Sequence, residues 1–300
     1  MEESWPQSPF VIEPKASDRH AMGSHWQPFY DDPAEIISNL PEIVGKARLP
    51  VGFGDRIECP EAPSHWVRGV HLSWPNGNQG LMLTLTIHTE RNQLISLYPF
   101  YRGGTQIRAT LDQVLVWESG VEAQVTVLIG DTPLTFFDTL FLNNRHLYKS
   151  GSSLAFILTG IAYAAEPAQQ SEVPLPEDSE LNQWIQISSD EHGNAAKETV
   201  STLSLEGAAI LIPIKEWDAD DYQFRGPVKE VGPVDEILGQ SGWLVVVTVL
   251  RGVEEDAEDF DLKVLITERA WSGQTPPKVG QDISGTLWLQ GFLWSNYSAY

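Results

Sequence analysis

Residues 121–130 read Val-Glu-Ala-Gln-Val-Thr-Val-Leu-Ile-Gly, with an apolar side chain at every second position. A period of two is typical of a half-buried strand, because successive side chains point to opposite faces of a sheet. Gly130-Asp131 is a turn signal, and the apolar stretch at residues 134–139 follows it. This part of the chain therefore predicts two neighbouring strands.

A similar string, Val247-Thr-Val-Leu-Arg-Gly252, lies in the second half of the chain. In each half a further strand follows, at residues 134–139 and 262–266, then a non-strand piece, a Lys-x-Gly sequence and an apolar strand. These last strands contain Leu158-Thr-Gly160 and Leu289-Gln-Gly291. Three strands, a connector and two further strands are the order of an oligonucleotide/oligosaccharide-binding (OB) barrel. The sequence predicts a mainly β protein of two tandem small units, OB-like barrels or sandwiches, with few short helices.

Composition shifts divide the chain into four predicted regions. Residues 1–65 form an N-terminal arm with a short helical segment, and residues 66–165 form the first β domain. Residues 166–205 form an acidic, Pro-containing linker or long loop, with a short helix near residues 181–187. Residues 206–300 form a second β domain, which is either a repeat of the first or an unrelated sheet.

Further patterns place individual elements. Asp31-Asp32-Pro33 predicts a helix start before an apolar pattern at residues 36–44, with Pro41 breaking that helix into two turns. Alternation predicts half-buried strands at residues 81–87 and 95–101. Apolar runs predict strands at residues 154–163, 243–250 and 283–293, and residues 140–148 read as helical turns.

The charge of the chain is unevenly distributed. The 300 residues contain 19 basic and 41 acidic side chains, a net charge of −22, and residues 166–261 alone contain 22 acidic and 5 basic ones. This acidity makes nucleic acid an unexpected partner, since binding to a phosphate backbone needs lysine and arginine. It favours a basic protein surface as the partner, because complementary charge speeds association.

Several classes of protein are disfavoured by what the sequence lacks. No secretory signal or bilayer-spanning apolar run is present, so we expect a cytoplasmic protein without a membrane partner. The single cysteine, Cys59, excludes an internal disulfide. No nucleotide-binding, zinc-protease or nucleophile-elbow motif occurs, and we expect no cofactor.

The first candidate binding stretch is residues 217–226. Trp217, Asp218, Asp220, Asp221, Tyr222 and Phe224 form an aromatic–acidic loop that could grip a basic partner or stack on a sugar. The alternative is that the three aromatic residues belong to the core of a strand entering the second β domain.

The second candidate is Asp138, which shares the face of Leu134 and Phe136 in an apolar strand. A carboxylate there would be desolvated and would need a partner, and Arg145 and Lys149 follow downstream. The alternative to a site is a structural hydrogen bond that fixes the following loop.

Metal binding has weaker support from spacing. Two acidic clusters, at residues 218–221 and 254–261, could supply oxygen ligands for calcium. The first cluster does not fit an EF-hand loop, because with Asp218 at position 1 the glycine of position 6 is replaced by Gln223. Cys59, His65 and His71 match no standard zinc pattern. We therefore interpret the acidic clusters as solvated acidic surface and predict no metal ligand.

Three functions are compatible with these patterns. The leading expectation is a non-enzymatic interaction protein of the inhibitor, immunity or regulatory type, whose acidic second half binds a basic protein. A carbohydrate- or small-ligand-binding barrel is the first alternative, since eleven tryptophans could supply aromatic platforms or fill cores. A metal-dependent hydrolase using the acidic clusters or Asp138 is the second.

Overall fold

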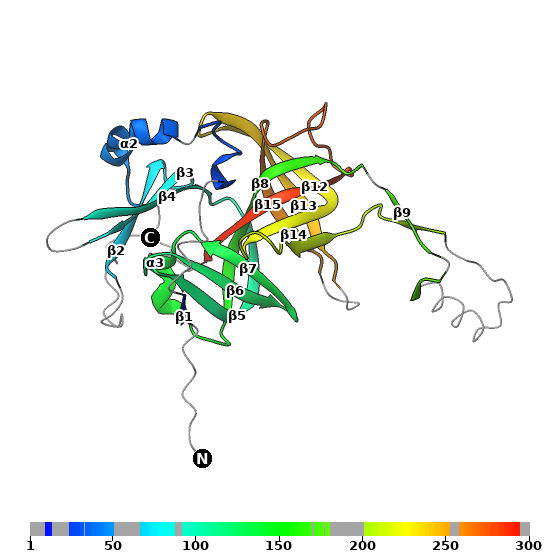
Figure 1. The fold of residues 1–300 in the computed structure, drawn as a ribbon, viewed down its shortest axis with the longest axis horizontal. Helices are drawn as coiled ribbons and strands as arrows, with labels where there is room; N and C mark the ends of the chain where they lie inside the picture. The colour runs from blue at the N-terminus through cyan, green and yellow to red at the C-terminus, as the bar shows by residue number, and fades with distance from the viewer. Residues whose placement is uncertain are drawn as a thin grey trace, which may run out of the picture.

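The computed structural model describes residues 10–13, 24–32, 34–50, 67–87, 92–169, 171–176, 178–180, 201–252 and 258–294. The prediction of a mainly β protein with few short helices is confirmed (Figure 1). The helical elements are η1 (Ser24–Trp26), α2 (Ala34–Lys46), α3 (Phe141–Asn144) and η2 (Arg145–Leu147). The first strands are β1 (Phe10–Glu13), β2 (Gly69–Pro75), β3 (Gln79–Thr86) and β4 (Gln93–Tyr101).

Four strands of the first half of the chain form a closed circuit with one strand of the second half. It uses β5 (Thr105–Trp117), β6 (Ala123–Ile129), β7 (Thr132–Asp138) and β8 (Ser153–Pro167). Strand β5 pairs with both β6 and β8, and β7 pairs in parallel with β15 (Asp282–Leu293), which in turn pairs with β8. We call this closed circuit, β5-β6-β7-β15-β8, the first ring. Val125, Val127 and Phe136 fill its interior, as the alternation predicts.

A second ring forms in the same way from the second half of the chain. It contains β12 (Asp221–Ile237), β13 (Gln240–Leu250), β14 (Phe260–Thr267), β8 and β15. Strand β14 pairs in parallel with β8, and β12 pairs with β15. The short strand β11 (Ile210–Pro213) extends the sheet beyond β12. Within the described residues each ring contains four strands from its own half of the chain and one from the other half. The strands β8 and β15 belong to both rings.

The two shared strands are antiparallel and pair over most of their length. Thr159 lies opposite Gln290, so Leu158-Thr-Gly160 pairs with Leu289-Gln-Gly291. A side chain has no room at these glycines: a Cβ on Gly291 would lie 2.6 Å from a methyl carbon of Leu158. The strings that match in sequence are therefore in direct contact at the junction of the rings.

A separate antiparallel sheet, β2-β3-β4, packs against the first ring. Leu81 and Leu83 face helix α2, whereas Met82 packs on the other side with Tyr98 and Phe137. The prediction of half-buried strands is therefore wrong for β3, which is buried on both faces because the helix covers one face and the ring covers the other.

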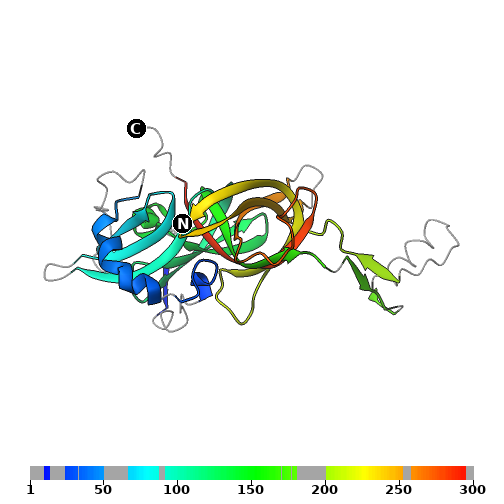
Figure 2. The same cartoon turned by 90° about the horizontal axis from the view of Figure 1, so that it is seen from above.

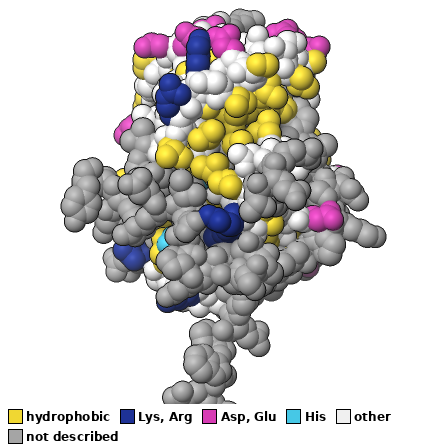
Figure 3. Space-filling view, turned by 90° about the vertical axis from the view of Figure 1, so that its left-hand side faces the viewer, with side chains coloured by type: hydrophobic (Ala, Val, Ile, Leu, Met, Phe, Trp, Pro, Cys, Tyr) yellow, Lys and Arg dark blue, Asp and Glu magenta, His cyan; other side chains and the backbone are white. Residues whose placement is uncertain are grey.

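Helix α2 begins where Asp31-Asp32-Pro33 predicts, and the Asp32 carboxylate accepts a hydrogen bond from the backbone N–H of Ala34 (2.9 Å). The predicted break at Pro41 is wrong, because the helix is continuous through it. Proline has no N–H, so the carbonyl of Ile37, four residues earlier, lacks its helical donor. Pro41 and Ile37 are both exposed, so the missing hydrogen bond lies on the solvent side of the helix. Figure 3 views the molecule from the side of α2 and shows hydrophobic side chains gathered there below a row of acidic ones.

The predicted linker region contains a two-stranded antiparallel sheet of β9 (Glu172–Pro174) and β10 (Thr202–Ser204). Figures 1 and 2 both show this small sheet projecting from the body of the molecule. The helix predicted near residues 181–187 lies outside the described residues. No helix in the described part of the chain is long and apolar enough to cross a bilayer.

Candidate metal centre

The turn that leads into β12 brings two of the sequence-predicted acids together. The backbone N–H of Asp221 donates to the carbonyl of Asp218 (3.0 Å), and the N–H of Asp218 donates to Asp221 Oδ2 (3.3 Å). Aspartate favours such turns because its side chain can bond to nearby backbone N–H groups. The turn fixes both carboxylates at the start of a strand that pairs with β15.

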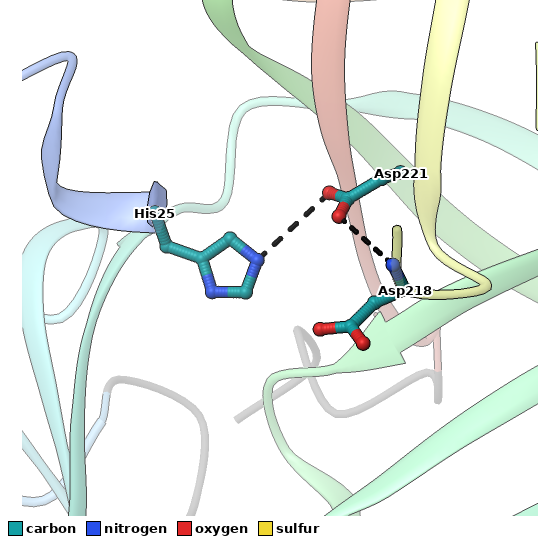
Figure 4. A group of neighbouring side chains, drawn as sticks. All are labelled: His25, Asp218 and Asp221. Atoms are coloured by element: carbon teal, nitrogen blue, oxygen red, sulfur yellow. Dashed lines mark hydrogen bonds and ion pairs between the residues drawn. The ribbon is translucent and has the colours of Figure 1, made fainter. Parts of the chain in front are cut away.

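A histidine from a distant segment completes the group. His25 of η1, Asp218 and Asp221 each offer one ligand atom, and these three atoms lie within 4.8 Å of one another (Figure 4). The Nε2 atom of His25 is 3.9 Å from Asp221 Oδ1. His25 and Asp221 are buried, whereas Asp218 is partly exposed and forms the solvent side of the cluster.

Aromatic rings hold the histidine in place. The imidazole of His25 stacks on the indole of Trp288, with ring centroids 3.9 Å apart, and also on the ring of Tyr163, with centroids 5.9 Å apart. The hydroxyl of Tyr163 donates a short hydrogen bond to Asp221 Oδ1. Burial, and then the charge on Asp221, raise the pKa of Tyr163 far above its ordinary value, so this hydroxyl stays a donor. One tyrosine therefore helps to orient both the histidine and the carboxylate.

Asp220 lies next in the chain and has a different role. Its carboxylate is buried and accepts hydrogen bonds from Gln124 Nε2 (2.6 Å) and Trp288 Nε1 (2.9 Å). Burial, and then the charge of Asp221, raise the pKa of Asp220 to about 6. Asp220 is not one of the three converging ligands, and it supports the cluster by fixing Trp288 and the start of β12.

The donor atoms suit a metal ion. One imidazole nitrogen and two carboxylate oxygens are ligands that first-row divalent cations accept. Ligands at about 2.1 Å from a tetrahedral ion lie about 3.4 Å apart, so the three donors would close slightly on binding. Three protein ligands leave further coordination positions for water.

The structure separates the residues of the predicted aromatic–acidic loop. Trp217 is 49% exposed and meets the ring of Tyr163 edge-on at 5.7 Å. Tyr222 and Phe224 are buried in the core, where the Tyr222 hydroxyl donates to the carbonyl of Thr135 and accepts from its N–H. Of the three aromatic residues in this loop, Trp217 alone therefore lies at the edge of the cluster.

The second predicted group lies around the connector after β7. Asp138 is buried and accepts hydrogen bonds from the Leu140 N–H (2.9 Å) and the Tyr148 hydroxyl (2.5 Å), which fixes the following loop. Burial raises the pKa of Asp138 to about 7. Arg145 is buried and donates to the carbonyls of Val67 and Gly120, whereas Lys149 is exposed.

Other groups considered for metal binding are placed elsewhere. In the second acidic cluster, Asp259 pairs with Arg251 (2.6 Å), and Asp261 pairs with Lys229 (3.4 Å), while residues 254–256 lie outside the described residues. His71 is buried beside Thr84, and burial lowers its pKa to about 3. Cys59 and His65 lie outside the described residues.

His25 is the functional candidate that the sequence did not reveal. It is about 190 residues from Asp218, and no motif or period links the two. Tyr163, Trp288 and Gln124 were equally invisible, since each reads as an ordinary strand residue. The chain matches no protein-family model, no curated protein and no solved structure in the three comparisons made.

Proposed function

We propose that this chain binds a divalent metal ion through His25, Asp218 and Asp221. The observation that carries the proposal is the convergence of three ligand atoms within 4.8 Å from two segments far apart in the sequence. Burying the carboxylates of Asp220 and Asp221 side by side is costly, and a bound cation offsets that cost. The ion would also tie η1 to the body of the second ring.

The mixed donor set favours Zn²⁺ or Mn²⁺ over Ca²⁺ and Mg²⁺. Calcium takes six to eight oxygen ligands and magnesium keeps several waters, whereas an imidazole nitrogen suits the transition ions. The side chain of Asp218 is partly exposed, so the ion could exchange with solvent from that side. A further proposal is that the bound ion catalyses hydrolysis, with a water molecule in one of the coordination positions that the protein leaves free.

Calorimetric titration of the metal-stripped full-length chain tests the site. We expect Zn²⁺ or Mn²⁺ to bind one ion per chain, and an ion at 100 times its Kd to stabilise the fold by about 2.7 kcal/mol. Asp221→Asn, Asp218→Asn and His25→Gln should each weaken binding at least tenfold. Asp259→Asn, which removes an acid paired elsewhere, is the control and should bind as the parent does.

Two results would overturn the metal proposal. One is an unchanged melting temperature and no binding heat for every divalent ion. The other is equal affinity in the parent, the three site variants and the control, since binding would then occur elsewhere. Far-UV circular dichroism of each variant establishes that it is folded before titration.

A basic protein partner is the second candidate function, and the exposed acids of residues 206–236 favour it. Within the described residues Glu206, Glu216, Glu230, Asp235 and Glu236 are exposed and form no ion pair. A lysine-rich peptide should bind the parent chain more weakly at high salt, and should bind Glu230→Lys more weakly than the parent. It should bind Asp112→Lys, which makes the same charge change on the first ring, as tightly as the parent. Equal binding to both variants would contradict a site on the second ring.

We also infer that the two rings are OB-like units related by an internal repeat. Support comes from equivalent registers: Val125 pairs with Phe136 on β6 and β7, and Val247 pairs with Leu262 on β13 and β14. In each ring the third strand pairs in parallel with the strand that the other half supplies. The repeat would thus differ from two separate barrels because the two rings share the strands β8 and β15.

A further inference from the structure

A pocket of about 410 Å³ opens at the end of the first ring, where β5, β8 and the end of β15 meet η2. Ligand pockets are commonly about 300–1,000 Å³, so this one could hold a small organic molecule. It is built around strand pairs that fix its walls: Arg108 lies opposite Ala155, and the N–H of Trp294 donates to the Ala155 carbonyl (2.8 Å). The pocket is therefore formed by paired backbone as well as by side chains.

The lining divides into a polar and an apolar part. Gln106 and Arg108 are two residues apart on β5 and project to the same face, and Ser153 of β8 also lines this part. Leu147, Leu154 and the indole of Trp294 supply the apolar part. Such a division suits a ligand with an apolar body and one polar end.

The guanidinium of Arg108 indicates the charge of that polar end. Several cations of the chain pair with a carboxylate, as Arg251 and Arg225 do. Within the described residues no carboxylate lies at ion-pair distance from Arg108. An arginine beside apolar side chains binds anionic groups well, because its planar fork matches carboxylates and is weakly hydrated.

We propose that this pocket binds a small amphipathic anion, with a flat or aliphatic body against Leu147, Leu154 and Trp294 and its anionic group on Arg108. This site is independent of the metal centre, which is formed by η1 and the start of β12. Binding here adds a small-ligand activity to the proposed metal binding.

Two fluorescent probes that differ in one anionic group test the proposal. 1-Anilinonaphthalene-8-sulfonate carries a sulfonate, and N-phenyl-1-naphthylamine is the same arylamine without it. We expect the full-length chain to bind the anionic probe at least tenfold more tightly. Arg108→Gln should remove that preference and leave the affinity for the neutral probe within twofold.

Two further variants keep the test specific. Arg251→Gln removes an exposed arginine that is paired with Asp259, and it should bind both probes as the parent does. Ser153→Trp, at an exposed position on the pocket wall, should block both probes without unfolding the chain. Equal affinity for the two probes, an unchanged preference in Arg108→Gln, or full binding by Ser153→Trp would each overturn the proposal, as would no binding at all.

Discussion

Replacing Gln124 by leucine should destabilise the protein by an amount that depends on pH. The amide of Gln124 donates a 2.6 Å hydrogen bond to Asp220 Oδ1, and both side chains are buried. Leucine has nearly the same shape, so the change mainly removes the donor. The carboxylate that it leaves behind titrates, because the pKa of Asp220 is raised to about 6.

The expected magnitude follows from the charge on Asp220. At pH 8 Asp220 is ionised, and losing a hydrogen bond to a charged group costs about 1.5–3 kcal/mol. At pH 5 Asp220 is protonated, and losing a neutral hydrogen bond costs about 0.5–1.5 kcal/mol. The difference of about 1.4 kcal/mol corresponds to a further rise of about one unit in the pKa of Asp220.

The direction follows from the pKa being higher in the folded chain than in the unfolded chain. The contribution of Asp220 to stability is present below its unfolded pKa and is lost as the pH rises through 6. In Gln124→Leu the loss is deeper and continues to about pH 7. The two chains should therefore differ most in stability at pH 8.

Urea unfolding of Gln124→Leu at pH 5 and pH 8, followed by circular dichroism, measures the effect. Gln290→Leu is the matched control, because Gln290 is equally buried and donates a 2.6 Å hydrogen bond to the neutral carbonyl of Pro99. Its cost should be the same at both pH values. If the two variants show the same pH dependence, or Gln124→Leu shows none, the reasoning about Asp220 is refuted.

Three further predictions follow from one buried carboxyl group and two glycines. Burial raises the pKa of Asp138 to about 7, so the stability of the protein should fall as the pH rises through 7. Asp138→Asn should flatten the corresponding fall in melting temperature between pH 6 and 8. The asparagine keeps an acceptor for the N–H of Leu140. Gly226→Ala should prevent folding or lower the free energy of unfolding in urea by more than about 3 kcal/mol, because its Cβ would lie 1.8 Å from the Thr248 carbonyl oxygen. Gly45→Ala in α2 should raise the free energy of unfolding by about 0.5–1 kcal/mol, because no atom lies within 4 Å of the new Cβ. Soluble, fully stable Gly226→Ala protein would contradict the first of these glycine predictions, and a destabilised Gly45→Ala the second.

Local patterns predicted β6 from its alternation, β13 from its apolar run, and the start of α2. They did not predict the length of β12, because Gly226-Pro227 and Gly232-Pro233 are turn signals. The structure accommodates these residues within one strand through register shifts after Val228 and Val234. Alternation reports which face of a strand is buried and not which strand lies beside it, so the sharing of β8 and β15 was also invisible.

The candidate site shows the same limit. The acids of residues 218–221 were predicted to be important, but as exposed surface, because a run of charge in a sequence is usually solvated. Burial of Asp220 and Asp221 depends on Gln124, Tyr163 and Trp288, which come from three other strands. Only the assembled sheet brings these donors and His25 to the turn before β12.

The sharing of β8 and β15 has a consequence for synthesis on the ribosome. Until residues 282–293 emerge, β7 lacks its parallel neighbour and β12 lacks β15, so the nascent chain holds two unfinished circuits with open edges. Unpaired edges of this kind are where chains associate wrongly. Strand β15 closes both circuits at once, and a polypeptide truncated before it would therefore lose both halves of the molecule together.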